Sequence, residues 1–236
     1  MHVLVVGAGT TGLTAALELA RRGVAVTVVD RKDRPSPLSR AVGITPESLE
    51  TLAPSGVTGK LLAEGVRYRR LVIHLGPRPV ADIALSDAGG DRPMILGLAQ
   101  DRTETHLSDA ARANGASIRY GTTLAGLEND GERVVARFAD GTDLAADVLV
   151  GADGIRSTVR GAIGLPYDGY DLPEEWSVAD VEAPGWPTKD AFSVFRLDRG
   201  EVAVVAPLSP TRFRVISNTP DALASLPVPM AVETVH

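Results

Sequence analysis

A glycine-rich segment close to the N-terminus constrains the fold more than any other part of the chain. It reads Gly-Ala-Gly-Thr-Thr-Gly from Gly7 to Gly12 and follows the short apolar run His2 to Val6. Such a run predicts a parallel strand that is covered on both faces. The first glycine permits a tight turn, the second lets a pyrophosphate approach the backbone, and the third lets a helix pack closely on the strand. The segment therefore predicts a strand–turn–helix unit that binds a dinucleotide.

The residues after the glycines continue this pattern. Apolar residues at helical spacing predict a helix from Thr11 to Arg22, and Ala25 to Val29 predict a second buried strand. Asp30 follows 18 residues after Gly12, close to the ~20 at which an acid hydrogen-bonds a ribose diol. An ionised Asp30 would repel a 2′-phosphate, so this site favours FAD or NAD over NADP.

A second glycine-rich segment occurs much later in the chain. The apolar run Val148 to Val150 leads into Gly151-Ala152-Asp153-Gly154, and a short helix is predicted to follow as far as Arg160. Glycine allows close approach of a backbone, and the Asp153 carboxylate can accept hydrogen bonds from a ribose. The two segments together predict one bound dinucleotide.

Composition excludes several other classes of protein. The chain has 236 residues, 44% hydrophobic content, no cysteine and a formal charge of -6, which indicates a globular protein without disulfides, thiolate metal sites or a basic nucleic-acid footprint. The four histidines are scattered, so no metal site is expected. No apolar stretch reaches the ~18 residues of a membrane span, and no targeting segment precedes the first strand. We therefore expect no membrane partner and a cytoplasmic protein.

Between the glycine segments the pattern alternates between helix and hairpin. A helix is predicted from Thr45 or Pro46 to Leu52, and a hairpin from the runs 68–75 and 80–85. Asp101 and Glu104 resemble a capping box that begins another helix. A further hairpin is expected around Asp130-Gly131, and beyond Gly164 the runs 193–197, 202–206 and 213–217 read as antiparallel strands.

Four blocks in this order resemble the single-component FAD-dependent aromatic hydroxylases, the family of para-hydroxybenzoate hydroxylase and the polyketide and phenol hydroxylases. The blocks are Gly7 to Gly12 with Asp30, Ser39 to Gly43, Gln100 to Leu107, and Val150 to Arg160. The resemblance implies an α/β fold, in which a Rossmann-like FAD-binding domain carries an inserted, mainly antiparallel β-sheet substrate domain. We assign residues 1–70 and 95–165 to a discontinuous FAD-binding domain, and residues 71–94 and 166–236 to the substrate domain.

The resemblance also implies roles for individual residues. The glycine turn cradles the pyrophosphate, the acid at Asp30 holds the adenosine ribose, and Arg40 approaches the phosphates and the ribityl chain. Gln100 hydrogen-bonds flavin atoms, and the segment that begins Asp153-Gly154 takes part in binding both FAD and NADPH. The complete set of candidate cofactor-binding residues is Gly7, Gly9, Thr10, Thr11, Gly12, Asp30, Arg31, Arg40, Gln100, Leu124, Asp153 and Gly154.

The function implied by the resemblance is hydroxylation of an aromatic or polyketide substrate. NADPH or NADH would reduce FAD transiently, oxygen would add to the flavin, and the resulting hydroperoxide would transfer oxygen to the ring. The family's later Gly-Asp-Ala motif, which seats the ribityl chain and pyrophosphate, has no counterpart, since the only Gly-Asp pair is Gly90-Asp91. We therefore expect a chain that lacks the flavin-ring segment, and no catalytic residue is assigned.

Two other interpretations remain open at this point. The chain could be a non-catalytic FAD-binding module, or half of an enzyme completed by a homo-oligomer or by another chain, because exposed strand edges favour association. An NAD-dependent oxidoreductase without flavin is the third interpretation. Arg40, Gln100 and Asp153-Gly154 argue against it, because a simple NAD fold does not need those blocks.

Overall fold

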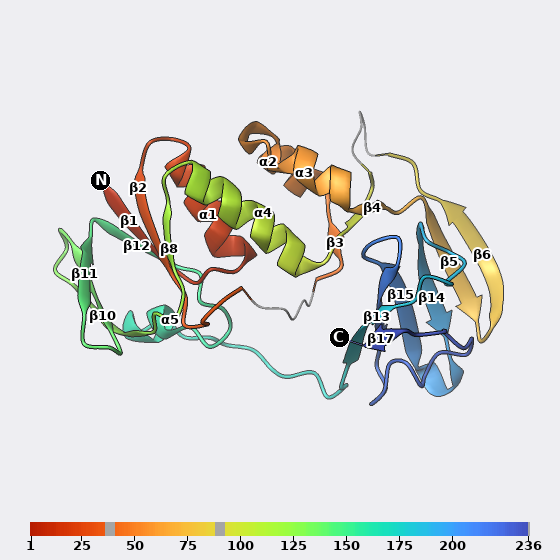
Figure 1. Ribbon diagram of the computed structural model, residues 1–236. Coiled ribbons are helices and arrows are strands. Elements are labelled where there is room, and N and C mark those ends of the chain that lie inside the picture. The colour runs from red at the N-terminus through yellow and green to blue at the C-terminus, as the bar shows by residue number, and fades with distance from the viewer. Residues whose placement is uncertain (36–40, 88–92, 236) are drawn as a thin grey trace. The chain divides into compact units, whose positions relative to one another are not determined.

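The computed structural model describes residues 1–35, 41–87 and 93–235, which form two compact units (Figure 1). The first unit comprises residues 1–39 and 100–169, and the second comprises residues 40–99 and 170–236. Both units are discontinuous, as the predicted domains are, but residues 40–70 and 95–99 group with the second unit instead of with the nucleotide-binding strands. It stays a prediction that one domain binds FAD and the other binds the substrate.

A four-stranded parallel sheet forms the centre of the first unit. Its strands stand in the order β12 (Val148–Gly151), β1 (His2–Val6), β2 (Ala25–Val29) and β8 (Ser117–Arg119). The predicted strands His2 to Val6 and Ala25 to Val29 are confirmed, and four of the five residues of each are buried. These near-continuous apolar runs are typical of parallel strands covered on both faces.

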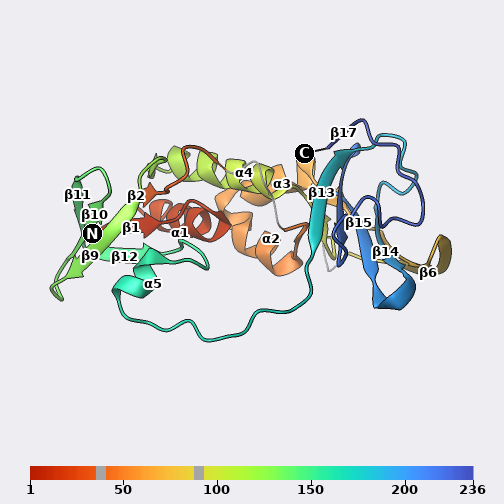
Figure 2. The same cartoon turned by 90° about the horizontal axis from the view of Figure 1, so that it is seen from below.

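Two helices of the first unit lie side by side (Figures 1 and 2). Helix α1 (Thr10–Ala20) joins β1 to β2, and helix α4 (Gln100–Ala113) precedes β8. Leu13 and Leu17 of α1 are fully buried. The prediction placed the end of α1 at Arg22, but Arg21 is already its C-cap, and Gly23 then takes a positive φ of 81° that a glycine readily adopts.

The predicted capping box at the start of α4 is wrong. Asp101 is the second residue of the helix instead of its cap. Glu104 accepts a hydrogen bond from Nε2 of Gln100 at 2.8 Å, so it pairs with its neighbour one turn away. The i, i+4 spacing of Gln100 and Glu104 puts them on one helix face, which is the physical reason for this pairing.

A small antiparallel sheet and a short helix complete the first unit. The sheet has the order β11 (Asp143–Ala146), β10 (Val134–Phe138) and β9 (Leu124–Asn129), and the helix is α5 (Thr158–Ala162). The predicted hairpin at Asp130-Gly131 is confirmed, with φ of 92° at Gly131. Leu124, Phe138 and Val159 pack in one buried apolar cluster with the first strand, which joins these elements to the central sheet.

A seven-stranded sheet dominates the second unit. Within this sheet only β14 (Ala191–Arg196) and β5 (Arg70–Leu75) run parallel, so the prediction of a mainly antiparallel sheet is confirmed. The hairpin predicted from the runs 68–75 and 80–85 forms β5 and β6 at one edge. The strand order is β17 (Thr234–Val235), β13 (Ser177–Glu182), β16 (Arg212–Ser217), β15 (Val202–Pro207), β14 (Ala191–Arg196), β5 (Arg70–Leu75) and β6 (Arg78–Ala84).

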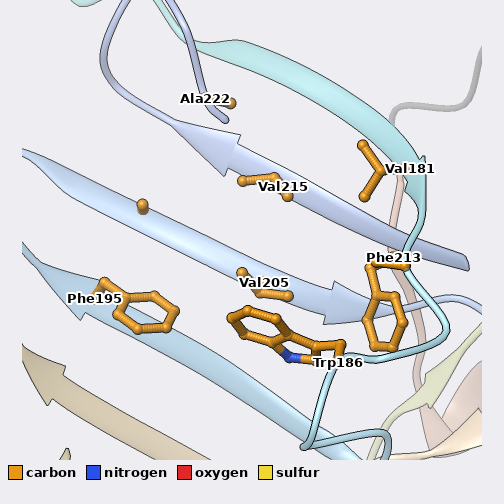
Figure 3. Close-up of a cluster of buried hydrophobic side chains, with 9 residues drawn as sticks. Val181, Trp186, Phe195, Val205, Phe213, Val215 and Ala222 are labelled. Atoms are coloured by element: carbon orange, nitrogen blue, oxygen red, sulfur yellow. The ribbon is translucent and has the colours of Figure 1, made fainter. Parts of the chain in front are cut away.

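One face of this sheet carries an aromatic core (Figure 3). The rings of Trp186 and Phe213 meet edge to face, with centroids 6.5 Å apart. Val205 and Val215 are fully buried in the same cluster. Side chains alternate between the two faces along each strand, so the residues that lie between these core positions in the sequence point to the opposite face of the sheet.

Short elements occupy the remaining part of the second unit. The predicted helix at 46–52 is confirmed as α2 (Pro46–Leu52), with Thr45 as its N-cap. A 3₁₀ turn, Ala53–Ser55, leads into α3 (Val57–Glu64). A small antiparallel sheet has the order β3 (Gly43–Ile44), β7 (Leu96–Gly97) and β4 (Val66–Arg67), and a second 3₁₀ turn spans Asp198–Gly200. Within the described ranges, no helix combines the length and the apolar character that a membrane crossing needs.

Candidate functional site

The turn from β1 to α1 is built on the close approach of backbones. Gly7 has φ of 109°, a conformation that side chains rarely adopt, and a Cβ there would lie 2.2 Å from the carbonyl oxygen of Ala152. A Cβ on Gly12 would lie 1.8 Å from the carbonyl oxygen of Gly7. The protein's own packing therefore requires glycine at both positions, and it brings the two predicted glycine segments together.

Gly9 differs from the other two glycines. Its φ is -82°, which any residue can adopt, and a Cβ on Gly9 would have Oε1 of Glu104 as its nearest atom, at 3.9 Å. Apart from the chain neighbours of Gly9, this oxygen is the only atom of the described chain within 4 Å of that position. The open side of Gly9 thus fits the close approach of a ligand.

Helix α1 begins directly at this open side. Thr10 and Thr11 are its first two residues, and the first amide groups of a helix have no partner within the helix. These N–H groups and the helix dipole make the start of α1 a suitable place for a phosphate. The residues present fit the pyrophosphate of a dinucleotide, and the role of Gly9, Thr10 and Thr11 as its backbone donors stays a prediction.

Asp30 lies at the end of β2 and is already ordered by the backbone around it. Its Oδ2 accepts from the N–H of Ala8 at 2.7 Å, and its Oδ1 accepts from the N–H of Lys32 at 2.8 Å. Each carboxylate oxygen has a second lone pair, so both can still accept from a ribose hydroxyl. Arg31 is exposed next to it. The geometry is consistent with the predicted role of Asp30.

Asp153 and Gly154 lie in the second glycine segment. The backbone N–H of Asp153 would be 2.9 Å from a Cβ on Gly7, so this segment adjoins the first turn. The Asp153 carboxylate accepts from Oγ of Ser157 at 2.5 Å and from the N–H of Thr158 at 2.7 Å. Its side chain therefore holds the start of α5, and a contact of this carboxylate with the cofactor stays a prediction.

Three other candidates have different positions. Gln100 lies on α4 and hydrogen-bonds Glu104, and Arg40 lies outside the described residues. Leu124 is 6% exposed within the apolar cluster of the first unit. Core packing accounts for its side chain, so a role for Leu124 in cofactor binding stays a prediction.

Glu104 is a residue of this site that sequence reasoning treated only as a helix cap. Its side chain is 5% exposed and lies beside Gly9. Burial is the main cause that raises the pKa of Glu104 above its usual value, and the nearby Asp30 carboxylate raises it further. The i, i+4 spacing of Gln100 and Glu104 was the available signal, because it puts both on one face of a helix.

A buried ion pair in the second unit was also not predicted. Nε and Nη2 of Arg214 donate to the two carboxylate oxygens of Asp180 at 2.6 and 2.8 Å. The remaining nitrogen, Nη1, donates to the carbonyl oxygen of Ala41 at 2.9 Å. Ala41 follows Arg40 in the sequence, so this pair holds the chain next to a predicted cofactor contact.

Tyr68 holds the neighbouring segment in the same unit. Its hydroxyl donates to the carbonyl oxygen of Pro207 at 2.8 Å, and burial raises the pKa of this hydroxyl far above its usual range. A Cβ on Gly97 would lie 2.4 Å from both the Tyr68 hydroxyl and the Pro207 carbonyl. This close packing explains why residues around Tyr68 and Gly97 group with the second unit.

The described residues contain no group of three or more acidic, histidine or cysteine side chains that could hold a metal ion. The site is instead formed by a parallel sheet, a glycine turn, a helix N-terminus and an ordered acid. Together these features define a dinucleotide-binding α/β protein.

Comparison with known proteins identifies the family within this class. A family described as FAD binding domain matches residues 1–222. The chain is 36% identical over 220 residues to 6-methylpretetramide 4-monooxygenase of Streptomyces rimosus, covering 91% of this chain and 39% of that protein. The chain therefore belongs to this family of FAD-binding proteins, which includes aromatic and polyketide monooxygenases.

Two further comparisons show the range of the family. The structure of aklavinone-11 hydroxylase in a ternary complex with FAD and aklavinone is similar, with a TM-score of 0.75 and 30% identity over 92% of this chain and 45% of that chain. Dialkyldecalin synthase of Streptomyces rugosporus is 29% identical over 216 residues, which are 91% of this chain and 45% of that protein. The chain thus spans less than half the length of these relatives.

Proposed function

We propose that this chain forms the FAD-binding part of a monooxygenase that hydroxylates an aromatic or polyketide substrate. The observation that carries the proposal is the backbone at Gly9, where a Cβ would meet no atom closer than Oε1 of Glu104 at 3.9 Å, and which leads into the start of α1. FAD is the dinucleotide that the family match supports. The relatives that act on aromatic and polyketide compounds support the substrate class.

The chain's own residues would bind and orient the cofactor. The amides of Gly9, Thr10 and Thr11 would donate to the pyrophosphate, and Asp30 would accept from the adenosine ribose. Arg31, Arg40, Gln100, Leu124, Asp153 and Gly154 complete the proposed set of cofactor-binding residues. The Asp180–Arg214 pair would hold the backbone at Ala41 through the bond from Arg214 to the Ala41 carbonyl oxygen.

When bound, FAD would supply the redox chemistry that activates oxygen for transfer to the substrate ring, with NADPH or NADH as its transient reductant. The protein's contribution to such chemistry is to bind and orient the cofactor and to exclude water from it. Cytoplasmic location, association with a second copy or with a complementing chain, and the choice between NADPH and NADH stay predictions.

Two measurements test the proposal in sequence. The first is titration of the purified chain with FAD, followed by quenching of flavin fluorescence, and saturable binding is expected. The second measures NADPH or NADH oxidation with phenolic and polyketide substrates under ¹⁸O₂, and one labelled oxygen per product is expected. Failure to bind FAD would contradict the whole proposal, whereas FAD binding without labelled product would contradict the monooxygenase activity of the chain.

A further inference from the structure

The buried acid Glu104 lies beside Gly9, where the proposed site would hold the negatively charged pyrophosphate. Its Oε1 accepts from Nε2 of Gln100 at 2.8 Å, and the backbone N–H of Thr10 lies close enough to this carboxylate to lower its pKa. Thr10 is the first residue of α1. The carboxylate therefore competes with a bound pyrophosphate for the N–H groups at the start of α1.

Two carboxylates lie near the N-terminus of α1 in the unliganded protein. Glu104 comes from α4 and Asp30 comes from the end of β2, and the two carboxylates repel each other. A pyrophosphate beside Gly9 would add further negative charge within a few ångströms of Glu104. Since like charges at short range in a buried site repel strongly, a charged Glu104 and the pyrophosphate are poorly compatible.

We propose that Glu104 holds the amide end of α1 while no dinucleotide is bound, and takes up one proton when the pyrophosphate of FAD binds there. This inference rests on the proposed FAD site. The proton comes from solvent and stays on the carboxyl group, so no other bond is made or broken. A protonated carboxyl group gains one O–H donor, which can hydrogen-bond a phosphate oxygen in place of repelling it.

The groups that face Glu104 favour such a protonation. Burial is the largest cause that raises the pKa of Glu104, and the Asp30 carboxylate raises it as well. The Gln100 amide, Lys32 and the Thr10 N–H lower it, but the net effect is a raised pKa. Tyr120, which follows β8, is the remaining titratable neighbour, and burial raises the pKa of its hydroxyl so that it stays neutral. The Glu104 carboxyl thus starts above its usual pKa before any ligand adds charge.

The sign of the pH effect follows from these charges. Bound pyrophosphate raises the pKa of Glu104 above its value in the unliganded protein. Below the unliganded pKa the carboxyl is protonated in both states, so affinity for FAD is constant. Between the two pKa values affinity falls as pH rises, by up to tenfold per pH unit for one proton, and above the higher value it is constant again.

The test is the dissociation constant of FAD measured on the full chain from about pH 5 to pH 8.5. We expect affinity to fall at least tenfold across this range, and calorimetry in buffers of different ionisation enthalpy to show net proton uptake on binding. Glu104→Gln keeps the shape and removes the charge, so its affinity should be independent of pH and close to the wild-type value at the acid end.

Asp109→Asn is the matched control. Asp109 is an exposed acid on the same helix, so this variant removes the same charge without touching the site and should keep the wild-type pH dependence. FAD binding with no pH dependence and no proton uptake in the wild type would overturn this inference but would leave the proposed function standing. A pH dependence that persists in Glu104→Gln would also overturn it.

Two further outcomes are distinguishable from these. Absence of FAD binding to the wild type at every pH would overturn the proposed function and this inference together. If circular dichroism shows that Glu104→Gln does not fold, the calorimetric proton count on the wild type decides, because a count of zero overturns the inference without any variant.

Discussion

At the scale of single residues, the three glycines of the first turn have different physical reasons to be glycine. Gly7 needs a positive φ, and Gly12 must let the backbone of Gly7 come close. Gly9 needs neither, because its φ is ordinary and a Cβ would have room. Folding therefore requires glycine at positions 7 and 12, whereas the glycine at position 9 is predicted to serve cofactor binding.

We predict that Gly9→Ala leaves the free energy of unfolding nearly unchanged but weakens FAD binding at least tenfold. The added methyl group occupies the space through which the pyrophosphate reaches the backbone. Urea denaturation measures the stability, and fluorescence titration measures the affinity. Gly12→Ala is the control, and we expect it to lower the free energy of unfolding by about 1–3 kcal/mol, as other overpacking changes in buried positions do. Unchanged FAD affinity in Gly9→Ala would contradict the assignment of the site.

At the scale of elements, the second glycine segment uses its acid to begin a helix. Asp153 accepts from the N–H groups of Thr158 and Val159 and from the hydroxyl of Ser157. Ser157 in turn caps α5 by accepting from the N–H of Arg160 at 2.9 Å. An acid at a helix start is favourable because it satisfies unpaired amides and meets the positive end of the helix dipole.

Asp153→Ala should therefore destabilise the start of α5 by about 1 kcal/mol. The measurement is hydrogen exchange of the amides of Thr158 and Val159, which should become faster while exchange in β1 changes little. Asp168→Asn is a suitable control, because Asp168 is an exposed acid of the following loop. Equal protection of α5 in the wild type and Asp153→Ala would show that the capping contacts do not contribute.

At the scale of the whole molecule, contacts between distant parts of the sequence hold each unit together. In the first unit, β12 pairs with β1 although nearly the whole unit separates them in sequence. In the second unit, Arg214 of β16 reaches Ala41 and Asp180 of β13. The guanidinium is 1% exposed, so its charge depends on these two partners.

We predict that Asp180→Ala lowers the free energy of unfolding by roughly 3–5 kcal/mol, because it leaves a buried guanidinium without its counter-charge. The double variant Asp180→Leu with Arg214→Met should be clearly more stable than the sum of the two single changes. Urea denaturation of the wild type, Asp180→Leu, Arg214→Met and the double variant measures this coupling. Arg137→Met is the control, since its pair with Glu128 is exposed, and we expect only a small change. Additive effects at Asp180 and Arg214 would contradict the coupling.

The first two strands, the glycine turn and the helix at 46–52 could be predicted because each depends on local rules. Apolar periodicity, glycine conformation and an N-cap act within a few residues. The capping box at Asp101 and Glu104 was predicted wrongly although the local pattern matched, because α4 already begins at Gln100 and Glu104 pairs with Gln100 one turn away. The capping pattern does not include this alternative partner.

The amino-acid sequence by itself determined the class of fold, the order of the glycine segments and the acid that follows the second strand. These features follow from the preferences of neighbouring residues. Only the tertiary structure decided that Gly7 meets Ala152, that Glu104 lies beside Gly9 and that Arg214 holds the backbone at Ala41. The physical reason is that these contacts join residues far apart in the chain, and buried polar groups take whichever partner the packing of strands and helices brings within reach.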